Sequence, residues 1–272
     1  MVQDRYEAKL RFATAFVKLA TAQHPDKVTV GQIVEETGKN RKTFYYHFED
    51  KSALVRWLFR YDIACELERY FPTHELVFDA TGDDEHLAGL PFYARHFQQN
   101  GTIDNTMFFE VFSRSLEKHR DYYRQVFSHV GGDSLDSYLH QIYTPCLRED
   151  VLYLIDRELE LRGGIDAPTI KSKMEESAAI DFLAEFFTGS FISRVITRIH
   201  DTGFNRSMHD IAPFENVIHE SLQLMIAKHL GPSEHQRLNA STVSPAAAIA
   251  RALALCGRNV WQAGQLISDS AT

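Results

Sequence analysis

Apolar residues recur at helical spacing along most of the chain. Residues 4–22 place Leu10, Ala13 and Val17 on one face, with further apolar positions broadening that face. The same spacing predicts further helices over residues 28–38, 40–48, 51–70, 91–99, 104–118, 119–130, 133–161, 168–201 and 213–230. No segment alternates apolar and polar residues as a half-buried strand does, so the pattern predicts an all-α fold.

Two of these helices are short and meet at a glycine. Thr29 can cap the first of them, Gly38 ends it, and Asn40 can cap the second. In the second helix Phe44 and Phe48 are four residues apart, so they share one face. We therefore expect that face to anchor the helix and the other face to point outward.

The outward positions of the second short helix are basic or can donate hydrogen bonds: they are Arg41, Lys42, Tyr45, Tyr46 and His47. Two short helices around a tight turn, the second rich in such side chains, are typical of a helix-turn-helix that enters the major groove. The alternative is an ordinary helical hairpin with solvated charges. Glu, Lys and Gln would then be the expected outward residues, whereas this helix carries aromatic rings and a histidine.

The segments divide the chain into three parts. Asp50 can cap the helix over residues 51–70, which Pro72 follows, and residues 73–89 are acidic and rich in turn formers. We therefore expect a helix-turn-helix domain with its linking helix at residues 1–71, a helical bundle at 72–231 and a helical extension at 232–272. The extension could be a second DNA-binding element, but its hydrophobicity favours docking on the bundle.

Charge is distributed unevenly. The net charge is −8, yet the first 60 residues contain 11 Lys or Arg against 7 Asp or Glu. A basic N-terminal segment on an acidic chain fits a protein that touches DNA with one end.

A signature then follows the turn. Thr43-Phe44-Tyr45-Tyr46-His47-Phe48-Glu49-Asp50-Lys51 resembles the end of the DNA-binding domain in the tetracycline-repressor (TetR/AcrR) family of transcriptional regulators. The chain departs from the common family pattern at Val34, Lys39 and the Arg41-Lys42 pair. These departures concern which operator sequence is bound and leave the class of protein unchanged. The resemblance implies nine DNA-binding residues. Arg41, Lys42 and Tyr45 would contact base edges, and Thr29, Thr43, Tyr46, His47 and Lys51 would contact phosphates. Asn40 belongs to the same set.

The resemblance also implies a ligand-binding and dimerising bundle after the linking helix. Pockets of this kind are lined by apolar and aromatic side chains. The candidate lining residues are Phe108, Phe112, Phe127, Tyr138, Tyr143, Phe182 and Phe186. Each could equally be plain core, and the two long C-terminal helices, which the family uses for dimerisation, could equally pack within the subunit.

Several other classes of function have no support in the sequence. The chain lacks the phosphate-binding, dinucleotide-binding and hydrolase motifs, and its histidines and Cys65, Cys146 and Cys256 have no metal-ligand spacing. We expect no enzyme activity, cofactor, metal or membrane span, and a cytoplasmic location.

The sequence thus predicts a homodimeric repressor that binds a palindromic DNA operator and responds to an unknown small molecule. The alternatives are a helical ligand-binding protein that has lost DNA binding and, more remotely, a helical-bundle enzyme.

Overall fold

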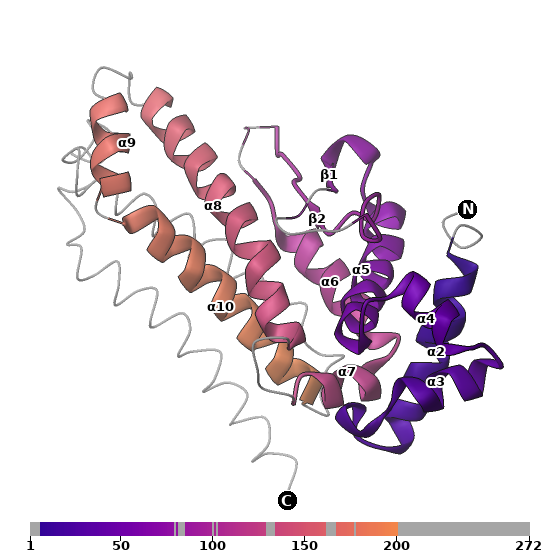
Figure 1. Cartoon of the computed structure of the whole chain (residues 1–272). Helices are drawn as coiled ribbons and strands as arrows, with labels where there is room; N and C mark the ends of the chain where they lie inside the picture. The colour runs from indigo at the N-terminus through magenta and orange to yellow at the C-terminus, as the bar shows by residue number, and fades with distance from the viewer. Residues whose placement is uncertain are drawn as a thin grey trace, which may run out of the picture. The chain divides into compact units, whose positions relative to one another are not determined.

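The computed structural model describes most of the first 200 residues. The described residues are 6–78, 80, 85–99, 101, 103–128, 134–161, 167–176 and 178–200, and all belong to one compact unit that spans residues 1–222. Helices dominate this part of the chain (Figure 1). The predicted all-α class is confirmed. The helix predicted at 213–230 and the extension at 232–272 lie outside the described residues.

The N-terminal helices form where the sequence predicts them. They are α2 (Glu7–Ala22), α3 (Val30–Thr37), α4 (Arg41–His47) and α5 (Lys51–Tyr70), with a short 3-10 helix η1 (Pro25–Lys27) between α2 and α3. We call residues 6–50 the head and residues 24–28, which join α2 to α3, the connector.

Local capping sets the helix boundaries in the head. The hydroxyl of Thr29 accepts a hydrogen bond from the backbone of Gln32, whose side chain in turn accepts one from the Thr29 backbone, which makes a capping box. Gly38 ends α3 with a left-handed φ of 64°, which glycine adopts without steric cost. Asn40 and Asp50 cap α4 and α5 through their side-chain oxygens, as predicted.

The segment after α5 corrects two predictions. It contains a 3-10 helix η2 (Thr73–Glu75) and two short antiparallel strands, β1 (Leu76–Val77) and β2 (Tyr93–Ala94), with Leu76 opposite Ala94 and Val77 opposite Tyr93. The predicted helix over residues 91–99 is therefore wrong, and so is the expectation that no strand is present.

The reason for the strand lies in a helix that is distant in sequence, α8 (Leu135–Leu161). Tyr93 and Arg95 both donate hydrogen bonds to the carboxylate of Asp150. Side chains two residues apart point the same way from an extended segment but not from a helix. The buried carboxylate therefore favours the extended backbone at this position.

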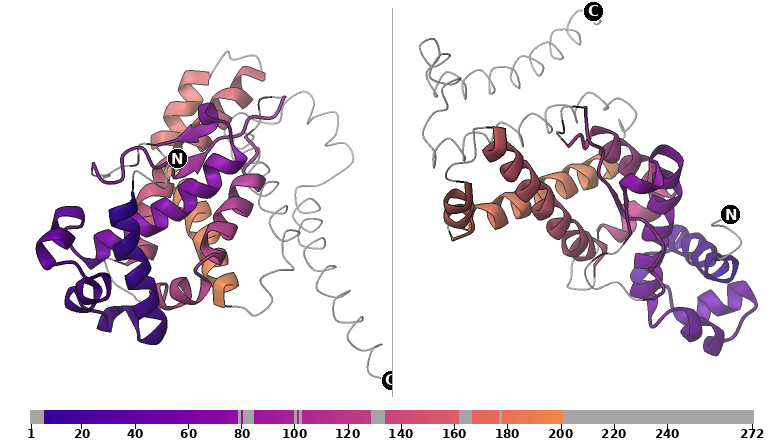
Figure 2. Two further views of the ribbon diagram at one scale, coloured as in Figure 1. Left: turned by 90° about the vertical axis from the view of Figure 1, so that its right-hand side faces the viewer. Right: turned by 90° about the horizontal axis from the view of Figure 1, so that it is seen from above.

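Within the described residues, the bundle contains five further helices. They are α6 (Thr106–Glu117), α7 (Arg120–Val126), α8 (Leu135–Leu161), α9 (Ala167–Glu176) and α10 (Ala179–His200), and α8 and α10 lie side by side over much of their length (Figures 1 and 2). Pro145 lies inside α8, which continues through it without a break. The single helix predicted over 168–201 is wrong: Ala178 takes a φ of 53°, which no α-helix accommodates, so α9 and α10 are separate.

Helix α5 links the head to the bundle. It packs against α2 in the head and against α6 and α8 in the bundle. Leu54, Trp57 and Leu58, predicted as its apolar face, are buried. They belong to one hydrophobic core that continues from the head into the bundle.

Candidate nucleic-acid interface

Helix α4 is anchored by two phenylalanines. Phe44 is 0% exposed, and its ring lies 5.5 Å from that of Phe12 on α2. Phe48, at the end of α4, lies 5.9 Å from the ring of Trp57 on α5. Edge-on ring contacts of this kind fix orientation as well as burying apolar area. One face of α4 is therefore held against α2 and α5.

The opposite face of α4 points into solvent. Arg41 and Lys42 are exposed, Tyr45 is 55% exposed and Tyr46 is 77% exposed. Tyr45 and Tyr46 are adjacent, and neighbouring exposed aromatic side chains are a feature of binding surfaces. Basic and hydrogen-bonding side chains thus occupy one surface of the head, as the sequence pattern predicts for a groove-reading helix.

The guanidinium of Arg41 lies against α3. A Cβ atom added to Gly31 would come 3.3 Å from Arg41 Nη2. Arg41 therefore rests over the first turn of α3, and reaching a base edge would require its long side chain to swing outward.

The two threonines expected on phosphates already have hydrogen-bond partners within the head. The Thr29 hydroxyl lies 3.1 Å from Gln32 Oε1, and the Thr43 hydroxyl lies 3.0 Å from Asn40 Oδ1. Each hydroxyl has one proton to donate, so a phosphate contact would compete with the capping interaction.

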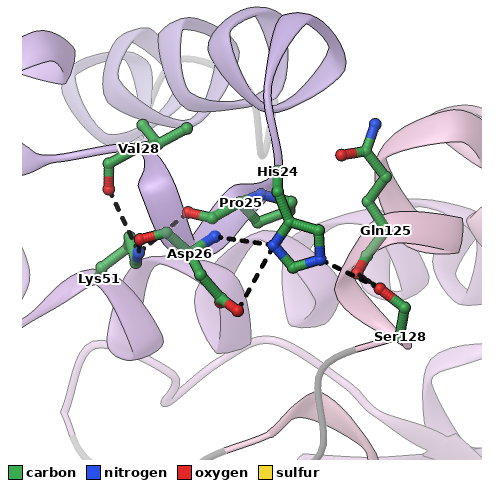
Figure 3. Close-up of polar contacts among 7 residues, drawn as sticks. All are labelled: His24, Pro25, Asp26, Val28, Lys51, Gln125 and Ser128. Carbon is green, nitrogen blue, oxygen red and sulfur yellow. Dashed lines mark hydrogen bonds and ion pairs between the residues drawn. The ribbon is translucent and has the colours of Figure 1, made fainter.

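Lys51 is placed differently from what the resemblance implies. Its ammonium donates to the backbone carbonyls of Pro25, Asp26 and Val28 at 2.9, 3.0 and 3.2 Å (Figure 3). The side chain is half-buried, and this burial lowers the pKa of the ammonium, although Asp26 opposes the shift. In the structure without DNA, Lys51 binds the connector.

His47 ends α4 and is half-buried beside the rings of Phe12 and Tyr46. Burial lowers the pKa of its imidazole, and the charges of Lys9 and His86 lower it further. At neutral pH His47 is therefore an uncharged donor, because its ordinary pKa is already near 6.5.

Comparison with known proteins decides what this head is. A family model described as "Bacterial regulatory proteins, tetR family" matches residues 15–58, which run from α2 through the first turns of α5. The chain carries a TetR-family DNA-binding domain. The TetR-family assignment makes it a DNA-binding transcriptional regulator with an N-terminal helix-turn-helix, in which α4 is the recognition helix.

Two further comparisons add little to the TetR-family match. No curated protein matched the chain. A solved structure described as "Dihydroxyacetone kinase operon activator DhaS" is 12% identical, with 81% of this chain and 95% of that chain covered and a TM-score of 0.37. A TM-score at this level is too low to bear on fold or function.

Beyond the TetR-family domain, α5 carries two buried charged residues that the sequence analysis missed. Arg60 donates to the Tyr138 hydroxyl at 3.1 Å and to the backbone carbonyls of Phe78 and Leu90. Asp62 accepts hydrogen bonds from Lys118 at 3.1 Å and from the Tyr123 hydroxyl at 2.8 Å. Arg60 and Asp62 are charged residues that stand beside Phe59 and Ile63 within an apolar stripe, and this sequence feature could have identified them. Both tie α5 to the bundle.

The seven candidate ligand-binding aromatics separate into two groups. Phe108, Phe112, Phe127, Tyr138 and Tyr143 are buried, and Phe108, Phe112 and Tyr143 contact Phe191 of α10 in one aromatic cluster. Phe182 and Phe186 lie elsewhere: they are 63% and 52% exposed on α10, with their rings stacked on each other. The structure thus does not bring all seven together.

The described part of the chain was also searched for metal sites and membrane spans. Within it, no group of three or more His, Cys, Asp or Glu side chains could hold a metal ion. None of its helices is both long enough and apolar enough to cross a bilayer.

Proposed function

We propose that this chain is a cytoplasmic, ligand-responsive repressor, and not an enzyme, which binds a palindromic DNA operator as a homodimer. We keep the three predicted parts, residues 1–71, 72–231 and 232–272. In this proposal the head binds DNA and the bundle binds the ligand. The observation that carries the proposal is the two-sided character of α4. Phe44 is fully buried, while Arg41, Lys42, Tyr45 and Tyr46 are exposed on the other side.

Dimerisation follows from the size of the recognition element. Helix α4 has seven residues, so it can reach few base edges and neutralise few phosphates. Two copies on half-sites about 34–36 Å apart would double the contacts. Phe182 and Phe186 support a dimer through α10, because adjacent exposed phenylalanines mark surfaces that bind other proteins.

A ligand site in the bundle is supported by its buried polar atoms. Among the described residues, the hydroxyls of Ser113, Tyr122 and Thr188 are buried and have no hydrogen-bond partner. Ser113 lies on α6, Tyr122 on α7 and Thr188 on α10. A buried hydroxyl without a partner costs free energy, which a ligand with polar groups could offset.

The test of DNA binding begins with a duplex that the wild-type chain selects from a random DNA library. Its affinity should fall steeply with salt, because Lys and Arg displace counterions from phosphates. Arg41→Ala should weaken binding to this duplex by about 1–3 kcal/mol and relax preference at one base pair per half-site. Lys42→Ala serves as the comparison. Salt-independent binding, or equal loss on the selected and random duplexes for Arg41→Ala, would contradict the proposal.

The test of ligand response uses the same duplex. A small molecule found by calorimetry to bind the chain should weaken operator binding, and operator should weaken ligand binding reciprocally, by about 1–3 kcal/mol. Unchanged operator affinity at saturating ligand would remove induction by that compound.

A further inference from the structure

The ammonium of Lys51 is fully occupied by the connector. An ammonium has three protons, and Lys51 directs them at the three carbonyls of Pro25, Asp26 and Val28 (Figure 3). A phosphate contact would therefore replace one of these hydrogen bonds. Pro25 and Asp26 belong to the 3-10 helix η1 and Val28 is its C-cap, so these carbonyls lie at the helix end that attracts a positive charge.

The connector is also held from the other side. His24 Nε2 lies 3.2 Å from the hydroxyl of Ser128, which donates to the carbonyl of Gln125 at the end of α7 (Figure 3). The connector thus lies between α5, which supplies Lys51, and α7, which supplies the Ser128 contact. Such a segment has little freedom to shift while both contacts persist.

The position of the connector sets the position of α3. Val28 is buried and is followed directly by Thr29, whose capping box begins α3. The backbone therefore passes from a carbonyl bound by Lys51 to the first residue of the helix-turn-helix. A displaced connector would move Thr29 and the first turn of α3, against which Arg41 lies.

We propose that Lys51 is a positioning residue for DNA binding, which fixes the connector and the start of α3 and makes no phosphate contact itself. The inference rests on the proposed DNA binding. It differs from a direct contact in one measurable respect. A lysine on a phosphate contributes about 0.9 to the salt slope, or about 1.8 for a dimer, whereas a positioning lysine contributes nothing.

Two variants separate the roles. Lys51→Met keeps the length of the side chain but removes the charge and all three donors. Lys51→Arg keeps the charge, but a planar guanidinium cannot converge its donors on three carbonyls. Positioning predicts that both variants weaken binding to the selected duplex about tenfold, the size of one lost contact, with the wild-type salt slope.

The result that overturns the inference is equally specific. If Lys51→Arg binds like wild type, or if Lys51→Met lowers the salt slope by about 0.9 per subunit, Lys51 contacts phosphate. Failure of the wild-type chain to show salt-dependent binding would instead refute the proposed function. Stoichiometric titration with duplex gives the binding-competent fraction of each variant, so that loss of folded protein is not counted as loss of affinity.

A measurement on the wild-type chain covers the case in which a variant does not fold. Reductive methylation with mass spectrometry should modify Lys51 slowly both with and without duplex, because its ammonium is already bound. The exposed Lys42 should react quickly in the free chain and slowly in the complex. Lys51 reacting as quickly as Lys42 in the free chain would overturn the inference.

Discussion

His47 should make operator binding depend on pH. Its imidazole ends the recognition helix, and burial, Lys9 and His86 keep its pKa below the ordinary value. A phosphate placed beside it would favour the protonated form and raise that pKa. The complex would then bind a proton more tightly than the free chain, so affinity should increase as pH falls.

The magnitude follows from the linkage between proton and DNA binding. An opposite charge at about 4–6 Å shifts a pKa by about 1–3 units. Taking the lower end, one unit corresponds to about 1.4 kcal/mol, or about tenfold in affinity per subunit. The gain begins as pH falls through the pKa of the complex and is complete below the lowered pKa of the free chain.

Fluorescence anisotropy with a labelled duplex at constant ionic strength measures this effect. For a one-unit shift, the slope of log affinity against pH should reach about half a proton per subunit at its steepest. His47→Gln keeps a hydrogen-bond donor but cannot titrate in this range, so its slope should be smaller. His74→Gln is the matched control, because His74 is an exposed histidine in η2.

Two results would refute the reasoning. Operator affinity of the wild-type chain that does not change with pH would mean that no phosphate approaches His47. An identical slope in wild type and His47→Gln would assign the proton uptake to another group. Unfolding of each variant is measured at the same pH values. This control shows whether a change in DNA affinity at low pH reflects loss of folded protein.

Three further predictions concern stability and assembly. Asn40→Ala should lower the free energy of unfolding by about 1 kcal/mol through loss of the α4 cap, while Asn40→Ser should retain most of it; equal urea midpoints for all three proteins would contradict this. Burial raises the pKa of the Asp62 carboxyl despite Lys118, so the stability that Asp62 contributes is present at acid pH and is lost as pH rises through the raised pKa. The unfolding free energy of Asp62→Asn minus that of wild type should therefore increase with pH. A difference that stays constant with pH would contradict this prediction. Replacing both Phe182 and Phe186 by serine should weaken the dimer in sedimentation experiments with little change in unfolding, since both rings are exposed; an unchanged dimer would place them outside the interface.

The head could be predicted closely because its determinants are local. Thr29, Gly38, Asn40 and Asp50 each act within a few residues of their own position, through caps or a left-handed φ. Spacing along the helix was sufficient to assign Phe44 to the buried face. These features need no knowledge of the rest of the chain.

The errors arose where distant residues decide the structure. Asp150 lies on α8, far along the chain from Tyr93 and Arg95, so nothing near residues 91–99 reveals that they are extended. The break at Ala178 has no glycine or proline to announce it. The contacts of Lys51 with three backbone carbonyls likewise depend on residues about 25 positions away and could not be predicted locally.

The candidate ligand site was harder to predict for a different reason. Aromatic residues recur at the same helical spacing whether they fill a hydrophobic core or line a ligand pocket. The sequence could not separate Phe108, which lies within an aromatic cluster, from Phe182, which is exposed. Burial of a hydroxyl such as that of Thr188 is likewise a property of the folded bundle.

The two buried charges on α5 limit how this helix can move. Sliding it by one residue would translate Arg60 and Asp62 by about 1.5 Å and rotate them by about 100°, which would break their contacts with Tyr138 and Tyr123. A screw motion is therefore costly, whereas a tilt about this point keeps both contacts. Lys51 lies about 16 Å along the helix from Asp62, so a tilt of about 10° would move the head by about 3 Å. In the proposed dimer, two heads moving in opposite directions would change their separation by about 6 Å, roughly one sixth of a helical turn of DNA, while the bundle core stays intact.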